Sequence, residues 1–230
     1  MKTIGIIGGM SWESSAQYYA LINRGVRDQL GPAHSAQILM HSLDFGPIAD
    51  AQSAGDWDQL AEVLAESARS LEVGGADCVL LATNTMHKLA DVVEEATDLP
   101  FLHIADCAAD AVCDAGITRV ALLGTAFTME GPFYRERLDE HHGLDVIVPE
   151  AEDRAEVHRI IYEELIAGQI IEESREAYRD IIAKLVGEGA KGIILGCTEI
   201  GLLIDQSDST VPLFDTTQLH AQAAVDFALS

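Results

Sequence analysis

Two segments of this chain, more than a hundred positions apart, follow the same pattern. Residues 75–85 run GADCVLLATNT, and residues 189–199 run GAKGIILGCTE. In each segment, Gly-Ala opens an apolar run that ends eight residues later at a small nucleophilic side chain, Thr83 in one copy and Cys197 in the other. The pair predicts two equivalent strand ends, at which a hydroxyl and a thiol act on opposite faces of one small molecule.

The duplication extends over most of the chain. The start, MKTIGIIGGM, aligns with residues 116–127, so that Gly8 corresponds to Gly124. These glycines precede the nucleophile of their own half by similar intervals, 75 and 73 positions. After each nucleophile, a proline opens another short apolar run and an alanine-rich segment follows. Because these features recur in the same order, two halves of common design are the simplest interpretation.

Short apolar runs alternate with amphipathic stretches along the whole chain, which favours parallel sheets covered by helices on both faces. The expected strands are residues 3–8, 36–43, 78–83, 100–104, 119–124, 144–148, 192–197 and 211–214. The expected helices are residues 13–30, 57–73, 87–96, 106–115, 130–142, 153–166, 172–188 and 218–228. We therefore expect an α/β protein with one domain of residues 1–104 plus 210–230 and a second of residues 105–209.

Composition excludes several classes of function. The formal net charge of −24 opposes nucleic-acid binding, which needs a basic surface. This acidity is typical either of adaptation to high salt or of an ordinary acidic protein. No apolar stretch approaches the roughly 18 residues of a membrane span, and the N-terminus lacks a signal peptide, so we expect a cytoplasmic protein. The four cysteines show no metal-ligand or disulfide spacing.

Small and polar residues follow the expected strands. In open α/β sheets, ligands bind beyond the carboxyl ends of strands. The segments at these positions are Gly8-Gly9-Met10-Ser11, Thr83-Asn84-Thr85, Gly124-Thr125 and Cys197-Thr198-Glu199. Each precedes an expected helix, whose free backbone N–H groups favour an anion. We expect these segments to hold a carboxylate.

A thiol at such a position suits proton transfer at carbon. Inverting an amino acid means removing the Cα proton and returning one on the other face, which requires an acid/base on each side. A helix N-terminus can lower a thiol pKa from its reference value of about 8.5, so we expect a lowered pKa for Cys197. Glu199 either relays the proton of this thiol or caps the next helix.

The motifs resemble those of the aspartate/glutamate racemase family, which works without pyridoxal phosphate. Cys197-Thr198-Glu199 after Gly196 is similar to the family's Gly-Cys-Thr-Glu, and Thr83-Asn84-Thr85 to its Cys-Asn-Thr, with Thr in place of Cys. The resemblance implies two pseudo-symmetric Rossmann-like domains with parallel four-stranded sheets, an active site in the interdomain cleft, and no cofactor. We also expect a homodimer. The substrate-binding residues implied are Met10, Ser11, Asn84, Thr85, Thr125 and Thr198.

The chain departs from this pattern at one catalytic position. A hydroxyl is a much weaker base than a thiol near neutrality, so we predict that Cys197 abstracts the proton, by family analogy from the L-enantiomer. Thr83, directly or through a water, would reprotonate the opposite face. Starting from the D-enantiomer should be slow, although the equilibrium constant between free enantiomers stays at one.

The substrate is left open by a second departure. Related racemases hold the distal carboxylate with basic side chains, but residues 44–52 and 165–168 contain no Arg or Lys, and Gln52 is the best polar candidate. Aspartate, glutamate and a neutral amino acid all stay possible. Two alternatives also stay open: a single-cysteine decarboxylase or isomerase of the same superfamily, and an amino-acid-binding protein without turnover.

Overall fold

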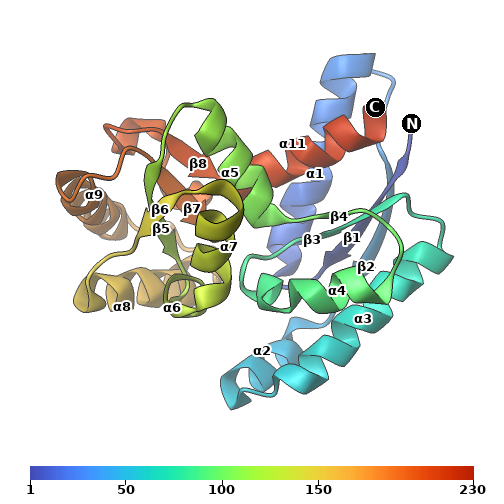
Figure 1. The fold of residues 1–230 in the computed structure, drawn as a ribbon, viewed down its shortest axis with the longest axis horizontal. Coiled ribbons are helices and arrows are strands. Elements are labelled where there is room, and N and C mark those ends of the chain that lie inside the picture. Colours follow the sequence, from blue (N-terminus) through green and yellow to red (C-terminus); the bar gives the residue numbers. More distant parts are fainter. The chain divides into compact units, whose positions relative to one another are not determined.

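The computed structural model describes all residues, Met1–Ser230, as two compact units (Figure 1). Unit 1 comprises Met1–Ile104 and His220–Ser230, and unit 2 comprises Ala105–Leu219. Each unit holds one four-stranded parallel sheet, in the order β2-β1-β3-β4 in unit 1 and β6-β5-β7-β8 in unit 2. The same strand order in both units confirms the predicted α/β class and matches the duplication in the sequence.

The elements alternate along the chain as the sequence predicts. The strands are β1 (Thr3–Gly8), β2 (Gln37–Ser42), β3 (Cys78–Leu81), β4 (Phe101–Leu102), β5 (Arg119–Gly124), β6 (Asp145–Ile147), β7 (Ile193–Gly196) and β8 (Leu213–Asp215). The α-helices are α1 (Trp12–Leu30), α2 (Phe45–Ala54), α3 (Trp57–Val73), α4 (Ala90–Ala96), α5 (Ile104–Asp114), α6 (Ala126–Glu130), α7 (Pro132–His142), α8 (Ala151–Ile160), α9 (Glu172–Gly187), α10 (Ile200–Leu203) and α11 (Thr216–Leu229). Three short segments are η1 (Thr85–Leu89) and η3 (Gln206–Asp208), both 3₁₀, and the π-helical η2 (Ile161–Leu165).

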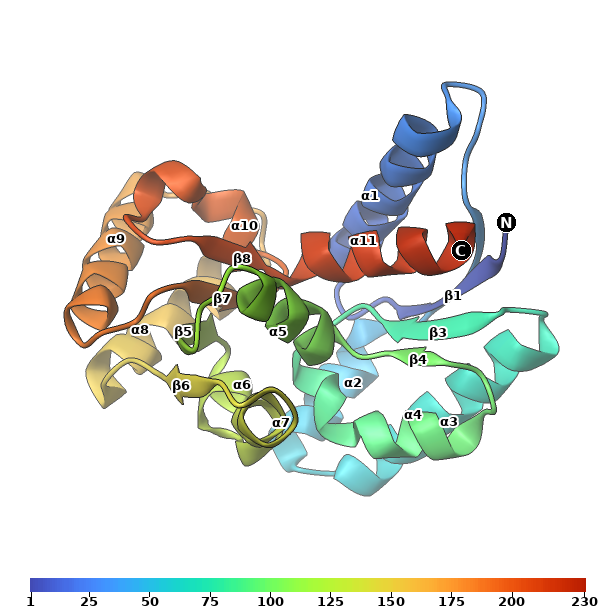
Figure 2. The same cartoon turned by 45° about the horizontal axis from the view of Figure 1, so that its top comes forward.

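Both faces of the sheet in unit 1 are buried. Successive residues of a strand point to opposite faces, so Ile7 packs in a core with α2 and α3, while Ile4 and Ile6 pack with α1 and α11. Figure 2 shows α1 and α11 on one side of this sheet and α3 and α4 on the other. Complete burial of a side chain of this size contributes about 1.5–3 kcal/mol to folding. The central strands β1 and β3 are thereby held rigidly.

The sheet of unit 2 is packed in the same way on its α8 and α9 face. Leu123 of β5 and Leu195 of β7 lie in a core with Val157 and Ile160 of α8 and Ile181 of α9. The residues of β5 that point to the other face, Val120 and Leu122, are also fully buried. The near-continuous apolar sequence of both central strands follows from this burial on two sides.

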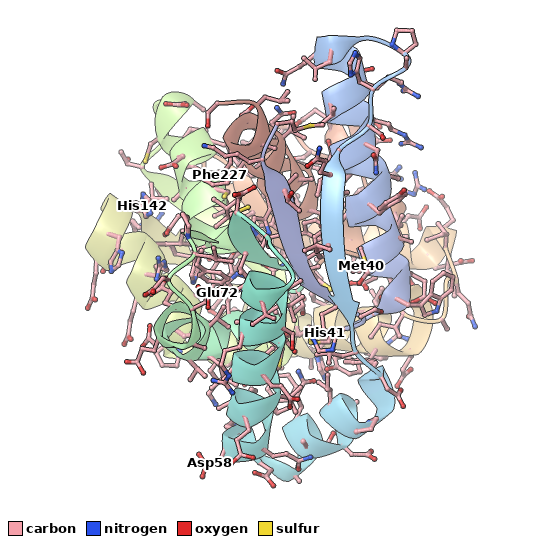
Figure 3. The ribbon with its side chains drawn as sticks, turned by 90° about the vertical axis from the view of Figure 1, so that its right-hand side faces the viewer. Met40, His41, Asp58, Glu72, His142 and Phe227 are labelled. Atoms are coloured by element: carbon pink, nitrogen blue, oxygen red, sulfur yellow. The ribbon has the colours of Figure 1, made fainter.

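The edge strand β2 is the most exposed strand of unit 1. Each of its residues is either exposed or only partly buried, and Met40 is 36% exposed. Figure 3 shows Met40 and His41 on this strand. The segments with candidate functional residues follow the buried central strands instead, so their positions are set by the core.

The structure differs from the sequence predictions at several places, of which three affect the domains or the longer helices. The second crossing between units falls after Leu219 rather than at residue 210, because β8 pairs with β7 in the sheet of unit 2. Helix α2 was not predicted, since its sequence FGPIADAQSA carries Gly and Pro near its start. The helix expected over 153–166 changes to a π turn at Ile161, where Ile166 N–H bonds to the carbonyl of Ile161.

Two glycines permit close backbone approach beside the candidate site. Gly9 has φ +91°, and a Cβ there would lie 2.1 Å from the carbonyl oxygen of Leu43. A Cβ on Gly124 would lie 2.8 Å from the carbonyl oxygen of Gly196 on the neighbouring strand. The loops after β1 and β5 can therefore turn tightly against their neighbours only with glycine at these positions. No helix of the chain has the length and apolar character needed to cross a membrane.

Candidate active site

The loop after β1 in unit 1 contains Met10 and Ser11. Ser11 is buried at the N-cap of α1, where its Oγ accepts a hydrogen bond from the backbone N–H of Ser14 at 3.3 Å. Ser15 Oγ accepts from the N–H of Gly9 at 2.7 Å. The side chain of Met10 packs in the core. Ser11 thus caps the helix, and the side chain of Met10 contributes to the core.

The predicted Thr83-Asn84-Thr85 segment lies directly beyond β3. Thr83 is partly buried, while Asn84 and Thr85 are buried, and η1 begins at Thr85. Ser14 Oγ donates a hydrogen bond of 3.5 Å to the carbonyl of Ala82. The α1 N-terminus and the end of β3 therefore lie together in unit 1, as expected for neighbouring parallel strands.

Gln52 reaches the same region from α2. Its side chain is buried, and its Nε2 donates to Met86 Sδ at 3.1 Å. Met86 follows Thr85 directly, so the amide of Gln52 packs against η1. This position is compatible with the predicted role of Gln52 in substrate binding.

His87 has a larger part in this segment than its sequence suggests. The structure shows it 2% exposed, with Nδ1 2.7 Å from the carbonyl oxygen of Thr83. The i,i+4 spacing between these residues was the available signal, but strand-to-3₁₀ turns of this kind are hard to recognise from sequence.

In unit 2, Thr125 occupies the position that corresponds to Gly9. It is buried at the N-cap of α6, and its Oγ1 accepts from the N–H of Thr128 at 3.3 Å. The next backbone N–H, that of Ala126, donates to His158 Nδ1 at 3.2 Å. The loop after β5 is therefore fixed by a hydroxyl cap and by an imidazole from α8.

Cys197, Thr198 and Glu199 form one hydrogen-bonded group at the end of β7. The thiol of Cys197 lies 3.0 Å from Glu199 Oε2, and Thr198 Oγ1 donates to the same oxygen at 2.7 Å. Thr198 and Glu199 are buried, and Cys197 is partly buried. Glu199 makes no side-chain cap to α10. Of the two roles considered for Glu199, the geometry supports the one at the thiol.

The expected lowered pKa of Cys197 is wrong for the protein without substrate. Burial raises the pKa of the thiol well above its ordinary value, and the charge of Glu199 together with the hydrogen bond to it raises the pKa further. The backbone N–H groups of Glu199 and Thr198 lower it, but to a smaller extent. The resting group is therefore a protonated thiol that donates to a carboxylate.

One aromatic residue that the sequence did not assign, Tyr162, lies near this thiol. Burial raises the pKa of the Tyr162 hydroxyl, and electrostatic interaction with the acidic groups of Cys197 and Glu199 adds to the effect. Tyr162 lies in the π turn η2, and its ring centroid is 4.5 Å from that of His158. π turns often occur at functional sites, because they shift side chains out of helical register. The i,i+4 spacing of His158 and Tyr162 was a signal for this pair.

The arginines of the acidic helix in unit 2 are held in ion pairs. Arg159 is bound by the carboxylates of Glu156 and Glu164, with N–O distances of 2.8 Å to each. Glu164 is buried and also accepts a hydrogen bond from Ser174. These ion pairs hold Arg159 in place along the helix.

The lysine nearest to a motif is engaged by an aromatic ring. Lys88 is the lysine nearest to a motif, and its ammonium lies 3.7 Å from the centroid of the Trp57 ring, an exposed cation–π contact. No group of three or more His, Cys, Asp or Glu side chains is arranged to hold a metal ion.

Comparison with known proteins gives consistent matches over the full length. The family model for Asp/Glu/Hydantoin racemase matches residues 7–224. The crystal structure of a protein assigned as an Asp/Glu racemase from Yersinia pestis is 53% identical, with a TM-score of 0.95 and 100% of both chains covered. An aspartate racemase homologue from Pyrococcus horikoshii is 35% identical, with a TM-score of 0.88 and 100% of both chains covered. The broad specificity amino-acid racemase RacX of Bacillus subtilis is 23% identical over 99% of this chain and 98% of its own.

Proposed function

The chain belongs to the Asp/Glu/hydantoin racemase family, and from this premise we propose that it is a cofactor-independent amino-acid racemase acting on aspartate or glutamate. Cys197 is the strong acid/base, on the face from which the L-enantiomer loses its proton. Thr83 is its weaker partner for the opposite face. The duplication supports this pairing, because both residues follow the equivalent central strand of their own unit.

The observation that carries the proposal is the hydrogen bond between Cys197 and Glu199. A thiol becomes a base only after it loses its proton, and Glu199 Oε2 at 3.0 Å is placed to receive it. The ammonium group of a bound amino acid would favour the thiolate, since a nearby positive charge stabilises an anion. Substrate binding thus reverses the electrostatics that keep the resting thiol protonated.

The proton balance of the reaction is simple. The Cα–H bond of the L-amino acid breaks and its proton goes to the sulfur of Cys197. The electron pair left on Cα then takes a proton from the hydroxyl of Thr83, directly or through a water, which gives the D-amino acid. Thr83 regains a proton from solvent, and Cys197 releases the proton it took through Glu199 to solvent, so that one proton enters and one leaves in each turnover. Both proton-transfer groups are side chains, so the reaction needs no cofactor.

The unequal strength of the two acid/base groups, Cys197 and Thr83, cannot appear as a difference in kcat/KM between the two enantiomers. Free enantiomers have equal free energies, so kcat/KM for the two directions must be equal. A weak partner at Thr83 therefore lowers inversion in both directions, and the slow start expected from the D-enantiomer applies to kcat and not to kcat/KM. The preference for L is measured instead by comparing the rate of proton exchange at Cα with the rate of inversion for each enantiomer. It can also appear in kcat and in KM when each is compared separately between the enantiomers.

The expected binding groups are short and polar. We propose that Asn84 and Thr85 of unit 1 and Thr125 and Thr198 of unit 2 hold the α-carboxylate and the amino group. The distal carboxylate would meet the amide of Gln52. His158 is a further hydrogen-bond donor for the substrate. Its Nδ1 accepts from the N–H of Ala126, so the proton of the neutral ring is on Nε2.

The test is a chiral assay of inversion with L- and D-aspartate, L- and D-glutamate and L-alanine. The proposal predicts inversion of an acidic amino acid, lost by a factor of about 10² or more in Cys197→Ser. Cys113→Ser, at an exposed cysteine, is the control and should keep full activity. Binding of an acidic amino acid without inversion or Cα–H exchange would indicate a binding protein, and loss of carbon dioxide would indicate a decarboxylase.

A further inference from the structure

A group of buried histidines lies behind Thr83 in unit 1. His87, His103 and His220 are each at most 5% exposed. The ring centroid of His87 is 4.5 Å from that of His103 and 6.0 Å from that of His220. The proposed reaction uses none of them, so their position at the end of β3 requires another explanation.

The hydrogen bonds of His87 define its protonation state. The backbone N–H of Ile104 points to Nε2 at 3.2 Å, so this nitrogen must be unprotonated and accept. The proton is then on Nδ1, which donates to the carbonyl oxygen of Thr83 at 2.7 Å. The ring is a neutral bridge between the end of β3 and the first residue of α5.

His220 forms a second bridge beside the first. Its Nε2 is 2.7 Å from the carbonyl oxygen of Leu102, which only accepts, so Nε2 carries the proton. Its Nδ1 then accepts from the hydroxyl of Tyr18 at 2.9 Å. Ile104 is the last residue of unit 1 before the chain first leaves it, and His220 is the first after it returns. The chain therefore leaves and re-enters unit 1 at two residues, Ile104 and His220, that belong to the hydrogen-bonded group beside the end of β3.

We propose that His87 is a positioning residue for Thr83: its neutral ring fixes the Thr83 carbonyl against the start of α5, and so sets the direction of the Thr83 hydroxyl. This inference rests on the proposed function, in which Thr83 protonates one face of Cα. A hydroxyl that transfers a proton has to be held closely, since an error of about 1 Å can cost a factor on the order of 10² in rate.

A matched pair of variants separates the two hydrogen bonds of the ring. The amide nitrogen of Asn can occupy the position of Nδ1, so His87→Asn keeps the bond to Thr83. The amide oxygen of Gln can occupy the position of Nε2, so His87→Gln keeps the bond to Ile104 and loses that to Thr83. The exposed His141→Gln serves as control.

The experiment follows deuterium entry at Cα and inversion of the L-amino acid in deuterium oxide for the wild type and these variants. We expect His87→Gln to lower the ratio of inversion to exchange by about 10-fold or more, while His87→Asn and His141→Gln keep it within about twofold. A wild-type ratio in His87→Gln, or equal loss of exchange and inversion, would overturn the inference. No exchange in the wild type would instead overturn the proposed function.

A measurement on the unmodified protein covers the case in which the variants do not fold. Nitrogen-15 NMR of the histidine rings at pH 7 should show His87 with a protonated Nδ1 and an unprotonated Nε2. The opposite tautomer or a doubly protonated ring would contradict the proposed bridge.

Discussion

The thiol of Cys197 lies 3.0 Å from Glu199 Oε2, and this carboxylate oxygen also accepts from the hydroxyl of Thr198. The acid/base group of unit 2 is therefore a buried pair rather than a lone cysteine. In the absence of substrate, the pair holds its proton on sulfur. Its behaviour depends on the charge of Glu199, which can be removed without altering the size of the side chain.

We predict that Glu199→Gln lowers the pKa of Cys197. Burial, the largest cause of the raised pKa, remains in the variant, but the charge of Glu199 is lost. The pH dependence of alkylation at Cys197, followed by peptide mass spectrometry, should move to lower pH. The exposed Glu188→Gln should leave it unchanged. An unchanged profile in Glu199→Gln would show that the carboxylate does not act on the thiol.

Thr83→Cys should increase inversion. A thiol in place of the hydroxyl supplies a second strong acid/base, and such a group contributes on the order of 10²-fold or more to a proton transfer. Because the equilibrium constant is one, kcat/KM must rise equally for both enantiomers. Chiral chromatography of initial rates measures this. Thr83→Ser should stay near the wild type, and Thr83→Val should lose inversion; wild-type inversion in Thr83→Val would remove Thr83 from the mechanism.

The stability of unit 1 should fall on mild acidification because of His220. Burial lowers the pKa of His220 to about 4, against an ordinary value of 6.5. Between these pH values the unfolded chain binds one more proton than the folded protein. The contribution of His220 to the free energy of unfolding is therefore fully present above pH 6.5 and is lost as the pH falls towards 4. The slope is about 1.4 kcal/mol per pH unit, which gives about 3 kcal/mol in all.

Urea unfolding at several pH values tests this. His220→Gln is expected to be less stable at pH 7, because it loses the ring between Tyr18 and Leu102. Between pH 4 and 6.5, the slope of its free energy of unfolding against pH should be smaller than that of the wild type by the amount that one proton contributes. His34→Gln, at an exposed histidine, should keep the wild-type slope. Equal slopes for wild type and His220→Gln would show that His220 does not titrate differently on unfolding.

Gly9→Ala should destabilise unit 1 by about 2 kcal/mol or more, since the added Cβ combines a positive φ with a clash against Leu43. Gly55 provides the matched control, because it has φ +73° but open space around its Cβ position. Gly55→Ala therefore carries only the conformational cost, about 1 kcal/mol. Urea midpoints of the two variants should differ, and equal midpoints would mean that the loop relaxes around the new methyl group.

The duplication made the fold predictable from sequence. Every expected strand is present to within two residues at each end, because β–α alternation and buried apolar runs leave few alternatives. Helix α2 was missed because Gly46 and Pro47 at its start resemble a loop. The boundary near residue 210 was misplaced because the pattern does not show that β8 pairs with β7.

The sequence singles out polar segments after the strands, but it does not indicate the electrostatics of these segments. The segments after the strands stand out by composition, yet the raised pKa of Cys197 depends on burial and on the direction of the Glu199 side chain. Tyr162 lies in a π turn, and the position of this turn is not indicated by the periodicity of the sequence. The expected homodimer and cytoplasmic location stay predictions.

The central claim is that a strong and a weak acid/base act on the two faces of one Cα. The most direct test incubates pure L- and pure D-enantiomer of the active amino acid in deuterium oxide and measures deuterium in both enantiomers at low conversion. We predict that recovered L gains deuterium faster than it inverts, because Cys197 returns exchanged protons to its own face. Recovered D should stay unlabelled while the L formed from it carries deuterium. Equal labelling of recovered L and recovered D would contradict the account.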